Sequence, residues 1–180
     1  MGTNVRLVPF EERHIRDDYI GWLNDKELMR YSRQRRIHHD RENCLEYLKG
    51  FRSTANHFWS IERRSDGKQI GTMTAYIDRE NRVADVGILI GAPGARGTGL
   101  GREAWGLALD HLFRSEDMRK VTGGASAANA PMIRIFEHWG MLLEGTRRKQ
   151  DLIDGEPCDV VLFGILREEW GRRVEPRLQA

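Results

Sequence analysis

Glycines gather in one stretch of this chain, and that stretch constrains the fold more than any other feature. Of 19 glycines among 180 residues, seven lie between positions 87 and 106. The densest part, Gly91–Arg102, follows an apolar run at Val83–Ile90 and precedes a helical pattern at Arg102–Phe113. Successive glycines let a backbone turn its N–H groups to one side, and a helix N-terminus adds partial positive charge. The pattern therefore predicts a strand, a loop that holds an anion such as phosphate, and a helix.

The charges around this loop agree with an anion site. No acidic residue occurs between Asp85 and Glu103, while Arg96 and Arg102 flank the turn. The local field is therefore expected to attract negative charge. A plain flexible connection without a ligand remains an alternative, because glycine-rich loops often only join two elements.

Two well-known phosphate motifs fit the loop poorly. A Walker phosphate loop needs Lys followed by Ser or Thr after its last glycine, but Gly99 is followed by Leu100. A dinucleotide fingerprint is nominally present from Gly99 to Ala104. It should follow a strand directly and be followed by an acidic residue, and no acid lies between Asp117 and Glu137. Neither motif accounts for the whole stretch.

Periodicity along the rest of the chain predicts alternating strands and helices in one domain. Asp66-Gly67 is a hairpin signal between two apolar runs, and Asp154-Gly155 is another near the end of the chain. Residues 1–170 are expected to form the domain and residues 171–180 a polar tail, with fraying from Arg167 onward. The expected strands are Val5–Pro9, His57–Glu62, Gln69–Ile77, Val83–Ile90, Lys120–Ala125, Leu143–Ile153 and Cys158–Leu166, and the expected helices are Glu11–Leu23, a segment capped by Asp40, Arg102–Phe113 and Pro131–Trp139.

Composition excludes several classes of protein. A net charge of +2 argues against a dedicated nucleic-acid binder, and no apolar run is long enough to span a membrane. Cys44 and Cys158 are too few for a disulfide framework and their spacing fits no metal site, so no metal is expected. The N-terminus lacks the apolar segment of a secretory signal, which predicts a cytoplasmic protein.

The segment Arg96-x-x-Gly99-x-Gly101 resembles the coenzyme A signature of the GNAT superfamily of N-acetyltransferases. Its flanks resemble the same family: Asp85–Ile90 matches the strand before the signature, and Asn129 with the following helix and Trp139-Gly140-Met141 matches the later part of the domain. The resemblance implies an α+β GNAT fold, with a mixed, mostly antiparallel central sheet flanked by helices.

The resemblance also implies an acetyl-CoA-dependent transfer of an acetyl group to a primary amine. Backbone groups of the strand before the loop would contact the pantetheine and thioester, the loop would hold the pyrophosphate, and the later asparagine would contact the cofactor arm. The residues that match these positions are Ile88, Leu89, Ile90, Arg96, Gly97, Thr98, Gly99, Leu100, Gly101, Arg102, Asn129 and Phe136.

Proton transfer is less well defined by the sequence. A free alkyl amine has a pKa of about 10 and must lose a proton before it attacks. Asp85 is the candidate general base, directly or through a water, and an Asp engaged in ordinary surface contacts is the equal alternative. Relatives often carry a tyrosine that protonates the leaving thiolate, but Phe136 stands at the matching position and cannot donate a proton.

The basic segment Arg30–His39 bears on the acceptor. It is either a solvated loop or an electropositive rim for an anionic acceptor. Within the superfamily, Trp22–Asp25 and the C-terminal hairpin resemble the amino-sugar nucleotide acetyltransferases of surface polysaccharide biosynthesis. The alternatives are a Rim-type acetyltransferase of ribosomal-protein N-termini and a non-catalytic coenzyme A binding module. No nucleic acid or membrane partner is expected, and the resemblance leaves a homodimer open.

Overall fold

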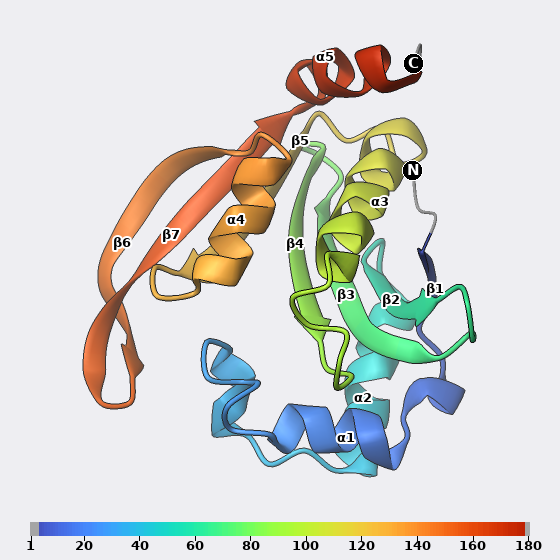
Figure 1. Ribbon diagram of the computed structural model, residues 1–180, viewed down its shortest axis with the longest axis vertical. Coiled ribbons are helices and arrows are strands. Elements are labelled where there is room, and N and C mark those ends of the chain that lie inside the picture. The colour runs from blue at the N-terminus through green and yellow to red at the C-terminus, as the bar shows by residue number, and fades with distance from the viewer. Residues whose placement is uncertain (1–3, 179–180) are drawn as a thin grey trace. The chain divides into compact units, whose positions relative to one another are not determined.

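A mixed sheet in the order β1-β2-β3-β4-β5-β7-β6 organises the chain in the computed structural model, which describes the backbone of residues 4–178 and the side chains of residues 4–172 (Figure 1). Strands β4 and β5 are parallel, whereas the pairs β1–β2, β2–β3, β5–β7 and β6–β7 are antiparallel. The strands are β1 (Val5–Pro9), β2 (His57–Arg63), β3 (Gln69–Asp78), β4 (Val83–Ile90), β5 (Lys120–Ser126), β6 (Leu142–Ile153) and β7 (Glu156–Leu166).

Helices connect the strands much as the sequence predicts. The helices are α1 (Asp17–Asn24), α2 (Arg41–Arg52), α3 (Leu100–Arg114), α4 (Ala130–His138) and α5 (Arg167–Leu178), and short 3-10 turns occupy Glu12–His14 and Arg33–Arg36. The expected α+β class and the mostly antiparallel sheet are confirmed. Among the described residues, no helix is both long and apolar enough to cross a membrane.

Two compact units divide this domain. The first comprises the chain up to Tyr76 together with Gly87–Leu107, and the second comprises Ile77–Val86 together with the chain from Ala108 onward. Strand β4 and helix α3 each contribute residues to both units. The units are described separately below.

The first unit has an aromatic core where α1 and α2 meet strand β2. Phe10 stacks on Phe58 with ring centroids 4.1 Å apart, and Tyr19 and Trp22 of α1 belong to the same buried cluster. This cluster also explains one glycine of the loop. A Cβ on Gly91 would lie 2.1 Å from the ring of Trp22, so only glycine leaves room for the indole.

The second unit is anchored by aromatic rings from α3, α4 and α5. Phe136 of α4 is fully buried and stacks on Phe163 of β7 at 4.9 Å. Trp170 of α5 is only 2% exposed and contacts the rings of Phe113 and Trp139, at 6.2 and 5.4 Å between centroids.

The prediction that the chain frays from Arg167 is wrong, because α5 begins there. The carboxylate of Glu169 accepts a hydrogen bond from the Leu166 N–H at 2.8 Å, and Trp170 provides the apolar anchor. The overall polarity of the segment hides the burial of Trp170. Helix α5 continues across the expected boundary after residue 170, and that division into domain and tail stays a prediction.

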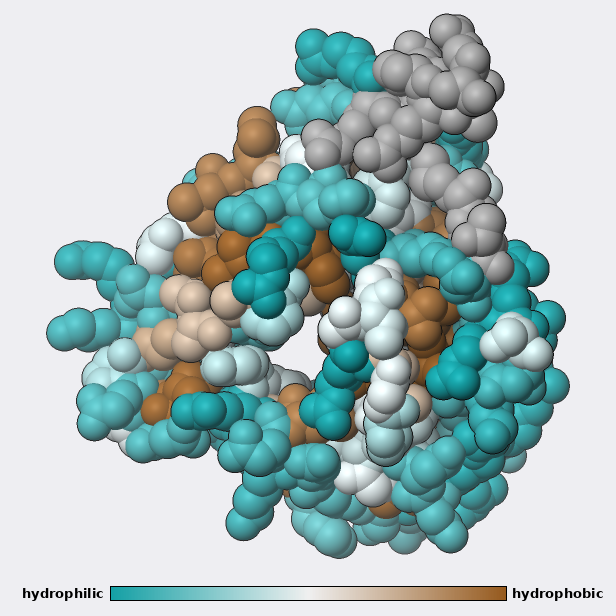
Figure 2. All heavy atoms as spheres, in the orientation of Figure 1, coloured by the Kyte–Doolittle hydropathy of each residue, from teal (hydrophilic) through white to brown (hydrophobic). Residues whose placement is uncertain are grey.

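The β6–β7 hairpin of the second unit exposes apolar side chains. Leu142, Leu143 and Leu152 are 60, 57 and 53% exposed. Figure 2 shows hydrophobic residues on the side of the visible face where this hairpin lies, with hydrophilic residues along most of the outer edge.

Candidate functional site

The glycine-rich loop of the first unit has the backbone conformation that its composition predicts. Gly94, Gly97 and Gly99 have φ angles of 75°, 76° and 89°, a region that L-residues rarely adopt. A Cβ added to Gly94 or Gly97 would find no atom within 4 Å. These glycines are therefore required by backbone conformation, and the space beside the loop is open to a ligand.

Helix α3 begins directly after the loop, at Leu100, two residues earlier than predicted. The N–H groups of its first turn have no partner within the helix, as at any helix N-terminus. Thr98 steadies the turn before it by donating its hydroxyl hydrogen to the carbonyl of Ala95 at 2.7 Å. The side chains of Arg96 and Arg102 are exposed.

The only acidic residue in the first turn of α3, Glu103, is engaged elsewhere. Its carboxylate accepts hydrogen bonds from the backbone N–H groups of Asn4 and Val5, at 2.7 and 3.0 Å, and from the Asn4 amide at 2.9 Å. Burial would raise the pKa of Glu103, but these hydrogen bonds hold it below the usual range. The loop and helix start therefore fit a phosphate group, as the sequence predicts.

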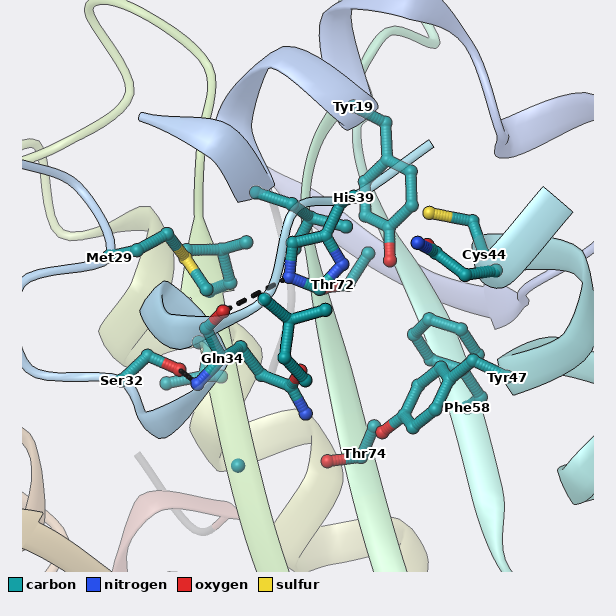
Figure 3. Close-up of a pocket in the computed structure, with 16 residues that line it drawn as sticks. Tyr19, Met29, Ser32, Gln34, His39, Cys44, Tyr47, Phe58, Thr72 and Thr74 are labelled. Atoms are coloured by element: carbon teal, nitrogen blue, oxygen red, sulfur yellow. Dashed lines mark hydrogen bonds between the residues drawn. The ribbon is translucent and has the colours of Figure 1, made fainter. Parts of the chain in front are cut away.

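A pocket of about 390 Å³ lies in the same unit, bounded by α1, α2, the segment between them, and strands β2–β4 (Figure 3). Ile88 and Leu89 line it, and both belong to the predicted thioester-binding strand. The pocket was not predicted from the sequence, although alternation along β3 and β4 places Thr72 and Thr74 beside Gly87 and Leu89. Its other lining residues are Tyr19, Leu23, Met29, Ser32, Gln34, Ile37, His39, Asn43, Cys44, Tyr47 and Phe58.

Aromatic rings and neutral polar groups make up most of the lining. Among the described residues that line the pocket, none is Asp, Glu, Lys or Arg. The hydroxyl of Tyr47 hydrogen-bonds that of Tyr76 at 2.7 Å. Burial raises the pKa of Tyr19, and burial together with the Tyr76 contact raises that of Tyr47. Burial also raises the pKa of the Cys44 thiol, so all three groups are protonated at neutral pH.

A second pocket of about 240 Å³ adjoins the first and shares Leu23, Met29 and Ile37 with it. Its lining also includes Arg35 and Arg36 of the predicted basic rim, whereas Arg30 and Arg33 are not among its lining residues. Among the described residues that line it, Asp25 is the one acidic residue, and one oxygen of its carboxylate accepts hydrogen bonds from the N–H groups of Glu27 and Leu28, each at 3.0 Å. The residues that contribute charge or polarity here are Asn24, Asp25, Lys26, Arg35, Arg36 and His38.

Asp85 belongs to the second unit and is exposed on β4. The parallel ladder between β4 and β5 joins Val83–Asp85 to Lys120–Thr122. At its end, the Thr122 hydroxyl donates a hydrogen bond of 2.8 Å to the Asp85 carboxylate. Asp85 is not one of the residues that line the 390 Å³ pocket, so its role as a base stays a prediction.

Asn129 and Phe136 also lie in the second unit and have structural partners there. The side-chain oxygen of Asn129 caps α4 by accepting a hydrogen bond from the Met132 N–H at 3.3 Å. Phe136 packs in the core against Phe163 with no exposed surface. Their contact with a cofactor stays a prediction.

The aromatic residues Trp22, Trp59 and Tyr76 do not line either pocket. Trp22 and Trp59 are 8 and 7% exposed and belong to the core, while Tyr76 reaches the first pocket only through its bond to Tyr47. The sequence does not distinguish His39 from the basic segment Arg30–His39, because it stands at the end of a run rich in arginine.

Known proteins resemble the chain in sequence and in fold. An N-acetyltransferase 9-like protein of Caenorhabditis briggsae is 26% identical over 142 residues, which cover 73% of this chain and 70% of the relative. The alpha/beta-tubulin N-acetyltransferase 9 of Homo sapiens is 24% identical over 153 residues, 76% of this chain and 72% of the relative. The spermidine N-acetyltransferase of Vibrio cholerae, solved with CoA and spermine, superposes with a TM-score of 0.84 at 22% identity, covering 94% of this chain and 99% of that one.

A family model described as an acetyltransferase (GNAT) domain matches residues 4–142. The match spans the sheet from β1 through β5, the glycine-rich loop and helix α4. The chain belongs to the GNAT family of acetyl-CoA-dependent N-acetyltransferases.

Proposed function

We propose that this N-acetyltransferase acetylates the amino group of a sugar that is linked to a nucleotide. The observation that carries the proposal is the pairing of two adjoining pockets of different character. The larger pocket is aromatic and neutral, and the smaller one carries Lys26, Arg35 and Arg36. An amino sugar linked to a nucleotide has the same division into a neutral ring and an anionic diphosphate.

The larger pocket suits a sugar ring. Tyr19, Tyr47 and Phe58 offer apolar ring surface, and Ser32 and Thr74 offer hydroxyl groups that hydrogen-bond in either direction. Small-molecule sites commonly combine an apolar wall with a few polar groups that fix orientation. Ile88 and Leu89 on β4 bring this pocket to the strand proposed to hold the thioester.

The smaller pocket suits the diphosphate. Arg35 and Arg36 supply guanidinium groups, whose planar fork matches phosphate oxygens. The carboxylate of Asp25 is occupied by the backbone of Glu27 and Leu28, which reduces its repulsion of an anion.

The polyamine named for the Vibrio cholerae structure and a protein N-terminus are the competing acceptors. Polyamines carry several positive charges and are best held by carboxylates, and no described residue that lines the larger pocket supplies one. The Rim-type alternative needs an extended peptide beside the pocket, and the cationic groups of the smaller pocket would repel a basic N-terminal segment.

An acceptor panel tests the proposal directly. Release of the CoA thiol from acetyl-CoA is followed with a nucleotide-linked amino sugar, the same amino sugar without the nucleotide, spermidine, and an N-terminal peptide. We expect the nucleotide-linked sugar to give the highest kcat/KM. The free sugar should have a lower kcat/KM, mainly because its KM is higher. A preference for spermidine or the peptide would overturn the assignment of the acceptor, and acetyl-CoA binding without turnover of any amine would favour the binding module.

A paired substitution isolates the diphosphate contact. Arg36→Gln should raise KM for the nucleotide-linked sugar about tenfold, because a charge-assisted hydrogen bond contributes about 1.5–3 kcal/mol, and should leave the KM for the free sugar unchanged. Arg134→Gln removes an exposed arginine that lines neither pocket and serves as the control. Equal effects on both sugars would remove Arg36 from the diphosphate site.

A further inference from the structure

We propose that His39 is the catalytic base of this enzyme, and that its Nδ1 takes the proton that the acceptor ammonium group must lose before it attacks. The inference deepens the proposed function and rests on it, since it requires an amine in the 390 Å³ pocket that His39 lines. It assigns the proton to a residue other than Asp85.

The hydrogen bonds of the imidazole define which nitrogen is free to act. Nε2 of His39 lies 3.2 Å from the carbonyl oxygen of Gln34. A carbonyl oxygen only accepts hydrogen bonds, so Nε2 carries the hydrogen. In the neutral ring Nδ1 then holds a lone pair and is a proton acceptor. Figure 3 shows this second nitrogen on the side of the ring that faces the Tyr19 hydroxyl within the pocket.

Hydrogen bonds to both the backbone N–H and the backbone carbonyl of His39 hold this residue in place. Asn24, the last residue of α1, accepts a hydrogen bond from the His39 N–H at 2.9 Å and donates one to the His39 carbonyl at 2.7 Å. Only 8% of His39 is exposed. A base with a fixed backbone, a fixed tautomer and little exposure to water is suited to one oriented proton transfer.

The other side chains that line the pocket cannot replace it. Among the described residues that line the pocket, His39 alone has a ring nitrogen whose lone pair can take up a proton. Tyr19, Cys44 and Tyr47 remain protonated at neutral pH because burial raises the pKa of each. Asp40, next in the chain, is occupied as the cap of α2 and accepts from the Asn43 N–H at 2.8 Å. The charged or titratable groups of the adjoining pocket are Asp25, Lys26, Arg35, Arg36 and His38.

The proton balance of the reaction is complete with this base. The ammonium group gives one proton to Nδ1 of His39, and the free amine forms a C–N bond to the thioester carbon. The C–S bond then breaks, the sulfur leaves with the electron pair, and the nitrogen loses its second proton to that thiolate. The products are the N-acetyl amide, the CoA thiol and an imidazolium, which returns its proton to water.

The place of His39 relative to the thioester strand supports the assignment. Ile88 and Leu89 line the same pocket as His39, so an amine bound there would be close to both the imidazole and the strand proposed to hold the acetyl group.

The first test is a pH profile of His39→Gln with the best acceptor from the panel. Gln preserves a donor toward the Gln34 carbonyl but cannot take up a proton. We expect kcat/KM at about pH 7 to fall about 100-fold, the usual size of a general-base contribution. The variant should regain activity by about tenfold per pH unit up to the pKa of the acceptor amine, because above that pH the amine is already deprotonated. Wild-type protein should reach its plateau at lower pH.

The second test is chemical rescue, which a purely structural role would not allow. His39→Ala leaves a cavity for free imidazole, and added imidazole should restore turnover in proportion to the concentration of its neutral form. His111→Gln, a histidine of α3 that does not line the pocket, is the control and should show no loss and no rescue. Acetyl-CoA affinity and melting temperature are measured for each variant to show that the fold and the cofactor site persist.

The outcomes separate this inference from the proposed function. If wild-type protein acetylates no nucleotide-linked sugar, the proposed function fails. If wild-type protein is active while His39→Gln keeps its activity and pH profile, or His39→Ala loses activity without rescue, the base is not His39 even though the acceptor is correctly assigned.

Discussion

The side chain of Asn24 makes two hydrogen bonds to the backbone of His39, one through each end of its amide, at 2.9 and 2.7 Å. The contact ties the end of α1 to the residue just before the cap of α2. A third bond, from the same amide nitrogen to the Ile20 carbonyl at 3.1 Å, fixes the orientation of the amide itself. The arrangement sets the position of the imidazole from a rigid helix.

We expect Asn24→Ala to lower kcat while acetyl-CoA affinity is retained, because His39 loses its fixed position but the glycine-rich loop is untouched. Loss of the three hydrogen bonds of the Asn24 side chain should also destabilise the protein by about 1.5–4.5 kcal/mol. Asn81→Ala is the control, since it removes the 2.8 Å hydrogen bond from the Asn81 amide to Asp78 at a turn that does not line the pocket, while the 2.9 Å bond from the Asn81 backbone N–H can persist. A wild-type kcat in Asn24→Ala would show that His39 needs no support from α1.

Gly99→Ala and Gly99→Glu together test the phosphate cradle. Both variants put a Cβ at a φ of 89°, so both carry the same backbone strain. The Glu variant adds a negative charge beside the first turn of α3. We expect acetyl-CoA to bind about tenfold or more weakly to Gly99→Glu than to Gly99→Ala, which corresponds to about 1.4 kcal/mol. Titration calorimetry measures the difference, and equal affinities would argue against phosphate binding at this loop.

Asp85→Asn separates the two candidate bases. Asn keeps an oxygen that can accept the Thr122 hydroxyl hydrogen, now 2.8 Å from the Asp85 carboxylate, so the variant loses charge while the contact can persist. If His39 takes the proton, we expect kcat/KM to stay within about threefold of wild type with the same pH profile, against the loss of about 100-fold typical of a removed base. A loss of that size with a shifted profile would return the role to Asp85.

A buried cluster at β1 and β2 predicts how stability depends on pH. His14 accepts a hydrogen bond at Nδ1 from the Glu11 N–H, at 2.8 Å, and its Nε2 lies 3.4 Å from Glu62, whose carboxylate also accepts two bonds from Arg6. Burial lowers the pKa of His14 and outweighs the opposing pull of Glu62. Burial would raise the pKa of Glu62, but the bonds from Arg6 and His14 lower it.

Both groups bind fewer protons in the folded than in the unfolded chain, so the free energy of unfolding should rise with pH. The His14 contribution is present above its unfolded pKa of about 6.5 and is lost as pH falls below that value, and the Glu62 contribution is lost below about 4.3. The free energy of unfolding of the wild-type protein, measured by urea denaturation, should fall between about pH 7 and pH 5. We expect His14→Gln to reduce that fall, whereas His38→Gln, at an exposed residue, should preserve it. Glu62→Gln should destabilise the protein by about 2 kcal/mol at neutral pH, and a uniform deficit at every pH would contradict the assignment.

Local sequence patterns predicted much of the fold. The glycine-rich segment lies between a strand and a helix as expected, and Gly94, Gly97 and Gly99 have the positive φ angles that only glycine adopts easily. Gly91 shows the limit of the same reasoning. The glycine-rich composition of the segment predicts that Gly91 belongs to the ligand loop. In the structure Gly91 instead leaves room for the ring of Trp22, which is 69 residues earlier in the chain. No local pattern contains that contact.

The C-terminal segment and the acceptor pocket also depend on tertiary contacts that local sequence patterns do not contain. Polar composition from Arg167 onward predicted fraying, and one buried residue, Trp170, instead anchors a helix. His39 was grouped with neighbouring arginines by charge, and only the fold separates it from them by burying its ring in a pocket.

Sequence by itself determined the class of chemistry, because the anion loop depends on neighbouring residues: glycines that permit unusual φ angles, followed at once by a helix N-terminus. Tertiary structure alone decided which side chains face the acceptor. The pocket takes residues from α1, α2, the segment that joins them and three strands, and its lack of Asp, Glu, Lys and Arg among the described lining residues is a property of that set. Charge and proton transfer at a site depend on distances in space, and those distances exist only once segments far apart in the chain have packed together.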